Sequence, residues 1–330
     1  MSFSSPVMRV TFLGNTTLHI TDGDTSILVD GFMSRNPLEE AFFPAGEENK
    51  CKVRPSRIYD YLLQGKITSV DVIVVGHSHY DHALDFAYIA ENIFSRAKVF
   101  GSRSTRMIGL GAGLGENRFY SDVDHRTTYL RIGCFTIKMV PSVHGNPWLY
   151  RGEIESPEPF RHLNDPQAGV VVSELKDGGV YTMIISHKAR NGQTRSALIQ
   201  NTAGYSVDLP PLADQVDAVF MTVTGLGTPE QNDRDNNYRN LVENTGARLV
   251  VPIHWDNFFA DINDILNDPA TEPYIFSDNI PQALDWVLER TKVSPSGTAF
   301  YQMKFFETID LYQDMDDVDP KRINTLWTIK

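Results

Sequence analysis

The 330-residue sequence is poor in cysteine. Its only two cysteines, Cys51 and Cys134, lack CxxC spacing and have no histidine beside them, so neither a disulfide framework nor a cysteine-rich zinc site is predicted. We expect two free thiols. Long apolar runs are also missing, and every run is far shorter than the roughly 20 residues that a membrane helix needs. The sequence therefore predicts no membrane span.

The chain also lacks basic runs. Its formal net charge is −12, and acidic residues gather near the C-terminus in DLYQDMDDVD, residues 310–319, which we interpret as a solvated segment. Nucleic acid is therefore not expected as a partner, because phosphate binding calls for basic patches. The N-terminal residues show neither a basic region nor the apolar region of a signal peptide. The expected location is the cytoplasm.

What the chain does have is a dense group of metal-binding side chains. In residues 71–82, DVIVVGHSHYDH, a buried strand is predicted to end at His77, His79, Asp81 and His82. Two further strand-like runs stop at a histidine: KMVPSVHG contains His144, and LVVPIHWD contains His254. Strands that end in the same place would bring these distant histidines together.

The remaining pattern predicts an α/β protein of two sheets with outer helices. Residues 8–30 alternate as in a β-hairpin around DGD, and a βαβ unit spans the central strand to KVFGS at 98–102. A second βαβ unit is predicted over 216–256, and residues 280–290 form an amphipathic helix. No linker divides the chain, so we expect a single domain over 1–330.

Four further segments are predicted to be loops or plain strands. Residues 34–57 lack any period and are expected to be a loop insertion, long enough to cover a site. The glycine-rich GLGAGLGEN at 109–117 lacks the Lys-Ser/Thr of a P-loop and is predicted to be a plain loop. Residues 168–201 suggest a three-stranded antiparallel meander with strands at 168–175, 180–188 and 195–201, and residues 299–311 one final strand.

Two histidines are assigned no function. His19 alternates with apolar positions and is expected to be half-exposed on its strand. His187 lies beside a turn and is expected at the surface.

The six clustered side chains suit a catalytic metal site. Zinc and similar ions take imidazole and carboxylate ligands and leave a position open for water. His77 and His79, two residues apart, can point to one side of a strand end and form one site with His144. Asp81, His82 and His254 would supply a second site nearby, as in two-metal centres.

These motifs are similar to those of the metallo-β-lactamase superfamily. HSHYDH at 77–82 resembles its HxHxDH motif, and His144 and His254 fall at the places of its later metal histidines. HSHYDHALD and PIHWDNF most resemble the branch that contains L-ascorbate-6-phosphate lactonase and the N-acylphosphatidylethanolamine-hydrolysing phospholipase D. The resemblance implies an αββα sandwich, the two ligand sets named above, and Asp30 as a residue that orients a ligand.

The chain departs from the superfamily at one position. A motif like GDTGY normally supplies an aspartate that bridges the two metals, and its equivalent here is NTAGY at 201–205. Thr202 takes the place of the aspartate, or Asn201 if the register shifts by one residue. Neither side chain is a carboxylate, so binding of a second ion should be weaker.

The sequence thus predicts a metal-dependent hydrolase in which a metal-bound hydroxide attacks an ester, lactone, amide or phosphoester of a small molecule, with Asp81 as ligand and proton acceptor. One or two divalent ions are expected, zinc first and manganese or iron as alternatives. Nearby aromatic residues suggest a partly apolar substrate: Trp148, Tyr150 and Trp255, with Phe258 and Phe259 better explained by core packing. The alternative is a metal-binding protein with little hydrolytic activity, such as a sensor; iron-dependent redox chemistry is a third hypothesis.

Overall fold

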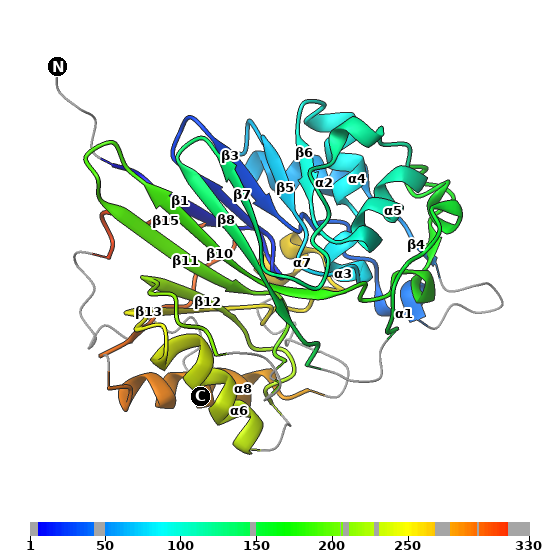
Figure 1. Cartoon of the computed structure of the whole chain (residues 1–330). Helices are drawn as coiled ribbons and strands as arrows, with labels where there is room; N and C mark the ends of the chain where they lie inside the picture. Colours follow the sequence, from blue (N-terminus) through cyan, green and yellow to red (C-terminus); the bar gives the residue numbers. More distant parts are fainter. Residues whose placement is uncertain are drawn as a thin grey trace.

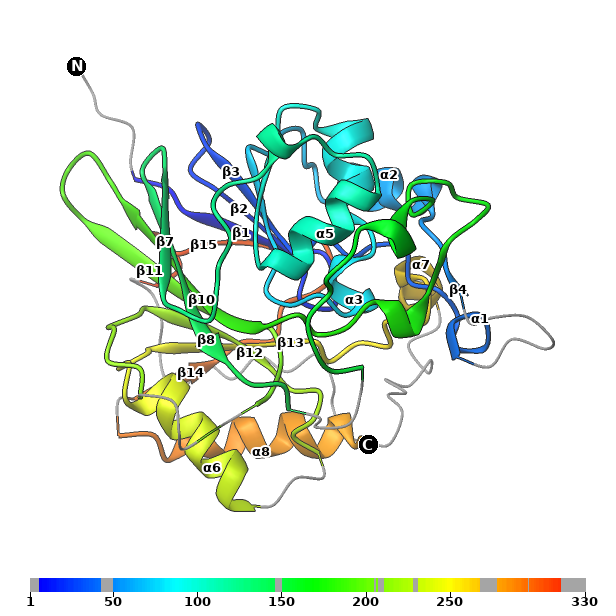
Figure 2. The same cartoon turned by 45° about the vertical axis from the view of Figure 1, so that its right-hand side comes forward.

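The computed structural model describes residues 6–42, 50–145, 150–204, 206, 211–227, 231–267, 278–295 and 297–315. Two large mixed β-sheets lie face to face with helices on their outer sides (Figures 1 and 2). One cluster of buried apolar side chains extends through both sheets and their helices. This is the predicted αββα sandwich, in which strands of continuous apolar sequence are covered on both faces.

The first sheet has the strand order β15-β1-β2-β3-β5-β6. Its antiparallel part contains the predicted hairpin of β2 and β3, and β5 and β6 form its parallel part. All three residues of β5 are buried, as expected for an inner strand. The bounds are β1 Arg9–Phe12, β2 Leu18–Thr21, β3 Ser26–Val29, β5 Val72–Val74, β6 Lys98–Phe100 and β15 Thr308–Asp310.

The second sheet has the order β14-β13-β12-β11-β10-β8-β7. The strands from β11 to β14 are parallel neighbours, whereas β7, β8, β10 and β11 are antiparallel. The bounds are β7 Thr128–Ile132, β8 Phe135–Ser142, β10 Val180–Lys188, β11 Thr194–Gln200, β12 Ala218–Thr222, β13 Leu249–Ile253 and β14 Ala299–Phe300.

Helices lie outside both sheets. Figure 1 shows α2, α4 and α5 beside the first sheet and α6 and α8 beside the second. The α-helices are α1 Leu38–Phe42, α2 Pro55–Gln64, α3 Tyr80–Ala83, α4 Phe86–Tyr88, α5 Arg103–Gly111, α6 Gln231–Tyr238, α7 Ile262–Asn267 and α8 Ile280–Lys292. The π-helical segments are η1 Ile89–Ile93 and η5 Arg239–Glu243, and the 3-10 helices are η2 Glu116–Arg118, η3 Glu158–Phe160 and η4 Val172–Glu174. Within the described residues, none of these helices is long and apolar enough to cross a bilayer.

The prediction of an irregular loop over 34–57 is wrong for the described part of this segment. It contains α1, the start of α2 and the strand β4, Lys50–Cys51. Ser34, Arg35 and Asn36 are fully buried. These buried side chains are polar, and their hydrogen bonds compensate for burial. The segment therefore shows no periodic pattern of apolar residues from which its structure could be predicted.

The first strand of the predicted meander is also wrong. Residues 172–174 form η4, and β9, Val170–Val171, pairs with β4 in a small separate sheet. The strand beside β10 is β8, which precedes it by a long connection. Gly178 and Gly179, both at positive φ, direct the chain into β10 from another direction.

Residues 299–311 are not one strand. They contain β14 of the second sheet and β15 of the first, so this segment crosses between the sheets. The glycine-rich stretch at 109–117 is not a plain loop either, because α5 extends to Gly111. A Cβ at Gly109 would lie 2.6 Å from the Phe119 ring, so this glycine permits close packing of the helix.

Both histidines without an assigned function are more buried than predicted. His19 is 6% exposed, because β2 is an inner strand and the backbone at Ser69 lies against its ring. His187 is 4% exposed and packs against Phe135 and Tyr312. Alternation of apolar and polar residues along a strand shows which side chains share a face of the sheet. It does not show which other parts of the chain pack on that face.

Candidate metal centre

The HSHYDH motif spans the end of one strand and the beginning of a helix. β5 ends at Val74, His79 is the residue before α3, and Asp81 and His82 lie within α3. Gly76 is required at the bend, because a Cβ there would lie 2.1 Å from the Asn201 side chain. The short turn from strand to helix points the four polar side chains into one region.

His77, His79 and His144 form the first cluster. One ligand atom from each lies within 4.8 Å of the others. The His79 Nδ1 and His144 Nε2 atoms are 3.1 Å apart, and the His77 ring centroid lies 4.9 Å from that of His79 and 5.2 Å from that of His144. His144 follows β8, so the cluster joins the two sheets.

His77 provides the test of whether this cluster fits a metal ion. It is 1% exposed, and among the described residues neither of its ring nitrogens has a hydrogen-bond partner. Burial, followed by the neighbouring histidines His82, His79 and His144, holds the pKa of His77 well below its usual value. A buried imidazole that is neutral and unpaired is costly, unless a metal ion accepts its lone pair. The donor set therefore fits a divalent ion.

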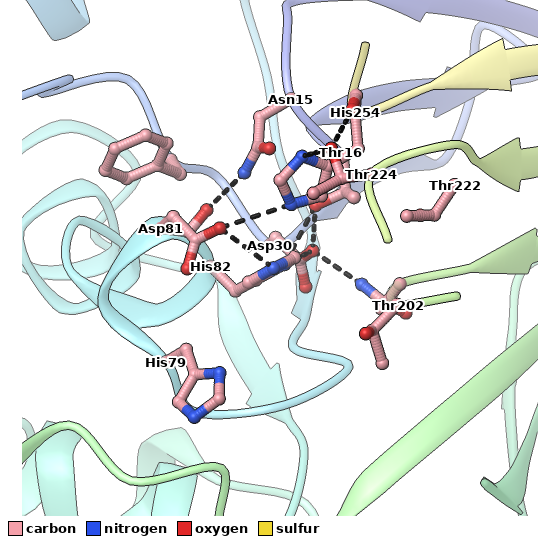
Figure 3. Close-up of polar contacts among 12 residues, drawn as sticks. Asn15, Thr16, Asp30, His79, Asp81, His82, Thr202, Thr222, Thr224 and His254 are labelled. Carbon is pink, nitrogen blue, oxygen red and sulfur yellow. Dashed lines mark hydrogen bonds and ion pairs between the residues drawn. The ribbon is translucent and has the colours of Figure 1, made fainter. Parts of the chain in front are cut away.

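Asp81, His82 and His254 form the second cluster, again with ligand atoms within 4.8 Å. Asp81 Oδ2 lies 3.2 Å from His254 Nε2 and 3.4 Å from His82 Nε2 (Figure 3). Burial opposes ionisation of Asp81, but His82 and His254 outweigh it and lower the pKa of the carboxyl. Burial likewise opposes a charge on His82, whereas Asp81 and Asp30 raise the pKa of this imidazole to about 10. The cluster thus holds an ionised carboxylate between two imidazoles.

Asp30 orients the second cluster. Its Oδ2 lies 2.8 Å from His82 Nδ1 and accepts a hydrogen bond from the Thr16 hydroxyl (Figure 3). Oδ2 also accepts a hydrogen bond from the Asn201 amide, while Oδ1 accepts the Gly76 N–H at 2.9 Å. Because His82 uses Nδ1 for Asp30, its Nε2 faces Asp81. This is the relation between a metal-binding histidine and its carboxylate partner that fixes the ring orientation.

Asn201 and Thr202 follow β11 beside the two clusters. The Asn201 amide donates to Asp30 Oδ2 at 2.6 Å, and the Thr202 hydroxyl accepts the N–H of Gly145 at 3.2 Å. Thr202 therefore contacts the residue that follows His144, whereas Asn201 belongs to the Asp30 network. Neither residue provides a carboxylate at this place.

Aromatic rings lie next to the clusters. Tyr150 stacks on Phe42 with centroids 6.5 Å apart, and Phe259 packs on Tyr80 and on Phe42. Phe258 is buried with its ring 5.0 Å from His254. The exposed parts of Tyr150, Phe42 and Phe259 make this border of the site apolar.

One predicted substrate residue does not lie at this border, and another cannot be placed. Trp255 is 3% exposed and packs between Phe12 and Phe305, which corrects its assignment to the substrate region: it belongs to the core. Trp148 lies outside the described residues.

Sequence reasoning missed three polar residues of the site. The Asn15 amide donates to the Asp81 carbonyl, Thr16 contacts both Asp30 and His82, and the Thr224 hydroxyl lies 3.0 Å from His254 Nδ1 (Figure 3). Asn15, Asp30 and His254 also have positive φ, an uncommon conformation that gathers at functional sites. The pair Gly14-Asn15 at a strand end was the one sequence signal for this turn.

Several solved structures share the fold of this chain. The metallo hydrolase Igni18 from Ignicoccus hospitalis matches with a TM-score of 0.50 and 14% identity over 92% of this chain and 98% of that one. The metallo-β-lactamase fold protein YhfI from Bacillus subtilis matches with a TM-score of 0.50 and 13% identity over 93% of this chain and 100% of that one. The diiron β-hydroxylase CmlA from Streptomyces venezuelae matches with a TM-score of 0.50 and 15% identity over 94% of this chain and 54% of CmlA. The chain therefore has the metallo-β-lactamase fold.

A relative is also found by sequence. It is described as a UPF0173 metal-dependent hydrolase of Carboxydothermus hydrogenoformans and is 27% identical over 260 residues, 78% of this chain and 90% of the relative. No family model matches the chain.

Proposed function

We propose that the protein is a metal-dependent hydrolase. It binds a divalent ion, zinc first, at His77, His79 and His144, and a second ion more weakly at Asp81, His82 and His254. The observation that carries the proposal is the buried His77 imidazole, whose two nitrogens have no partner in the described part of the chain and lie beside five further potential ligands. The metal-dependent hydrolase among its relatives supports the same function.

The protein's own residues have distinct roles in this proposal. When bound, the ion supplies Lewis acidity and a water acidified for attack. Asp81, ionised between two imidazoles, accepts the proton of the attacking water. Asp30 holds His82 so that its Nε2 points at the site, and Thr224 does the same for His254 through Nδ1.

The substrate is proposed to be a small molecule with an ester, lactone, amide or phosphoester bond and an apolar part. Tyr150, Phe42 and Phe259 would contact that apolar part, since they border the clusters. HSHYDHALD and PIHWDNF support a place in the branch of L-ascorbate-6-phosphate lactonase and the phospholipase D that hydrolyses N-acylphosphatidylethanolamine. The low basic content supports a substrate other than nucleic acid, and we propose a cytoplasmic location.

A second candidate is a metal-binding protein with little turnover. It is favoured by one observation: Asn201 and Thr202 provide no carboxylate where two ions would share one. An iron-dependent oxidation is a further alternative on the same ligands, and iron in protein from its native source would favour it.

Metal content and turnover distinguish these candidates. Elemental analysis of the purified protein is followed by lactone, phosphodiester and amide substrates with and without chelator. We expect His79→Ala to lose the first ion and turnover, and the matched variant His125→Ala to keep both, because His125 is exposed and outside the clusters. Stoichiometric metal without turnover of any substrate would contradict the hydrolase and leave the metal-binding protein. Absence of metal would contradict both.

A further inference from the structure

A third group of potential ligands lies at the opposite end of the sandwich. Asp22 is in the turn between β2 and β3, Cys134 in the turn between β7 and β8, and His187 near the end of β10. These turns lie at the end of the sheets away from α3 (Figures 1 and 2). Asp22 belongs to the first sheet and the other two residues to the second, so the group connects the sheets.

The three side chains converge. One ligand atom from each lies within 4.8 Å of the others, and His187 Nε2 is 3.3 Å from Asp22 Oδ2. Asp22 is held in place by its turn, because Oδ1 accepts the N–H groups of Asp24 at 3.0 Å and Thr25 at 2.7 Å. Its other oxygen is left to face His187.

The two turns that meet here are packed closely. A Cβ at Gly133, beside Cys134, would lie 2.1 Å from the Thr25 hydroxyl, and Gly133 has φ +54. A side chain at this position would push the turns apart. Glycine therefore keeps Cys134 close to Asp22.

Tyr312 can hold the His187 tautomer that directs a lone pair at the carboxylate. The Tyr312 hydroxyl lies 3.0 Å from His187 Nδ1 and 3.2 Å from the carbonyls of His187 and Gln193. When the hydroxyl donates its single proton to a carbonyl, Nδ1–H donates to the hydroxyl oxygen. In that tautomer Nε2 carries the lone pair that a metal ion needs, and it faces Asp22 Oδ2.

We propose that Asp22, Cys134 and His187 bind a divalent metal ion that fastens the two sheets together. Imidazole, thiolate and carboxylate are zinc ligands, and three of them leave one position for water. The Tyr312 hydroxyl would be the hydrogen-bond partner that fixes the tautomer of His187.

Cobalt reports this site separately from the catalytic clusters, because those contain no cysteine. Metal-depleted full-length protein is titrated with Co²⁺, and we expect a thiolate-to-cobalt charge-transfer absorption. Cys134→Ser should abolish the absorption and lower the zinc content of the purified protein by one equivalent. Cys51→Ala is the matched control and should retain both, since Cys51 is buried elsewhere.

Three results would overturn the proposal: no thiolate absorption in the wild-type protein, absorption that survives Cys134→Ser, or zinc content equal in the two proteins. His187→Gln should also lose the absorption, while its circular dichroism shows whether it is folded. A protein that shows this absorption but no turnover would contradict the proposed hydrolase and leave the metal site at Asp22, Cys134 and His187 in place. The two proposals can therefore fail independently of each other.

Discussion

At the scale of single residues, Asn201 and Thr202 bear on the second ion proposed above, because neither supplies a carboxylate. The Asn201 amide already satisfies Asp30, whereas the Thr202 hydroxyl contacts the loop of His144. We predict that Thr202→Asp strengthens binding of the second ion, because it adds an anionic ligand near both clusters. Competition with a chelator measures this affinity, and elemental analysis the stoichiometry.

Asn201→Asp is the matched variant. Its new carboxylate would replace an N–H donor 2.6 Å from Asp30 and place two anions at hydrogen-bond distance. We expect a lower melting temperature and no gain in metal affinity. If Asn201→Asp strengthens metal binding and Thr202→Asp does not, the alignment of Thr202 with the bridging aspartate is wrong.

His19 makes stability depend on pH. Burial lowers its pKa from 6.5 to about 4, partly offset by the backbone at Ser69. Between these values the unfolded chain binds more protons than the folded one, so His19 leaves stability unchanged above pH 6.5 and reduces it as the pH falls towards 4. The loss reaches about 3 kcal/mol near pH 4.

Urea unfolding of wild type and His19→Leu from pH 7 to pH 4 measures this contribution as a difference. The variant should lose less stability than wild type on acidification, whereas His125→Leu, at an exposed position, should keep the wild-type slope. Equal slopes for wild type and His19→Leu would show that His19 is protonated alike in the folded and unfolded states.

At the scale of elements, the inner strands were predictable. β5 and β13 are short, continuously apolar and buried throughout, because each has strands on both sides and layers on both faces. A histidine just beyond such a strand is placed near the sheet end by the strand itself. His254 directly follows β13, and His77 follows β5 after Val75 and Gly76, so local sequence indicated where both lie.

Pairing and burial through polar contacts were not predictable. β9 was assigned to the sheet of β10, but its partner is β4, more than a hundred residues earlier. Nothing in either short strand specifies this choice, since register depends on long-range packing. Asn15, Thr16 and Thr224 were missed for a related reason: polar residues have no periodic pattern, and only the fold shows which donor meets which acceptor.

The segment before α1 depends on a buried ion pair. Arg35 and Asp256 form a salt bridge with both side chains fully buried, and Arg35 also donates to the carbonyls of Asn257 and Ala260. We predict that Arg35→Ala destabilises the protein by about 3–5 kcal/mol, because it leaves Asp256 charged and buried. Chemical denaturation measures the loss.

Arg54→Ala is the control for charge alone. Its ion pair with Glu40 is partly exposed, so we expect a loss below about 1 kcal/mol. Similar losses for the two variants would mean that Asp256 finds water or another partner once Arg35 is gone.

At the scale of the whole molecule, the proposed catalytic ligands come from both sheets. His77 to His82 follow β5 of the first sheet, whereas His144 and His254 follow β8 and β13 of the second. Each cluster therefore contains side chains from the two layers. An ion bound there must act across the interface that holds the sandwich together.

Metal removal should accordingly lower the stability of the whole fold. An ion that binds only the folded chain stabilises it by about 2.7 kcal/mol at a concentration 100 times its dissociation constant, so we predict that chelator lowers Tm by several degrees. The experiment uses Cys134→Ser, so that the ion proposed for Asp22, Cys134 and His187 does not contribute. In this background His79→Ala should respond less to chelator, because the first ion is already lost. An unchanged Tm in Cys134→Ser, with and without chelator and at every zinc concentration, would mean that the histidine clusters hold no ion in the folded protein.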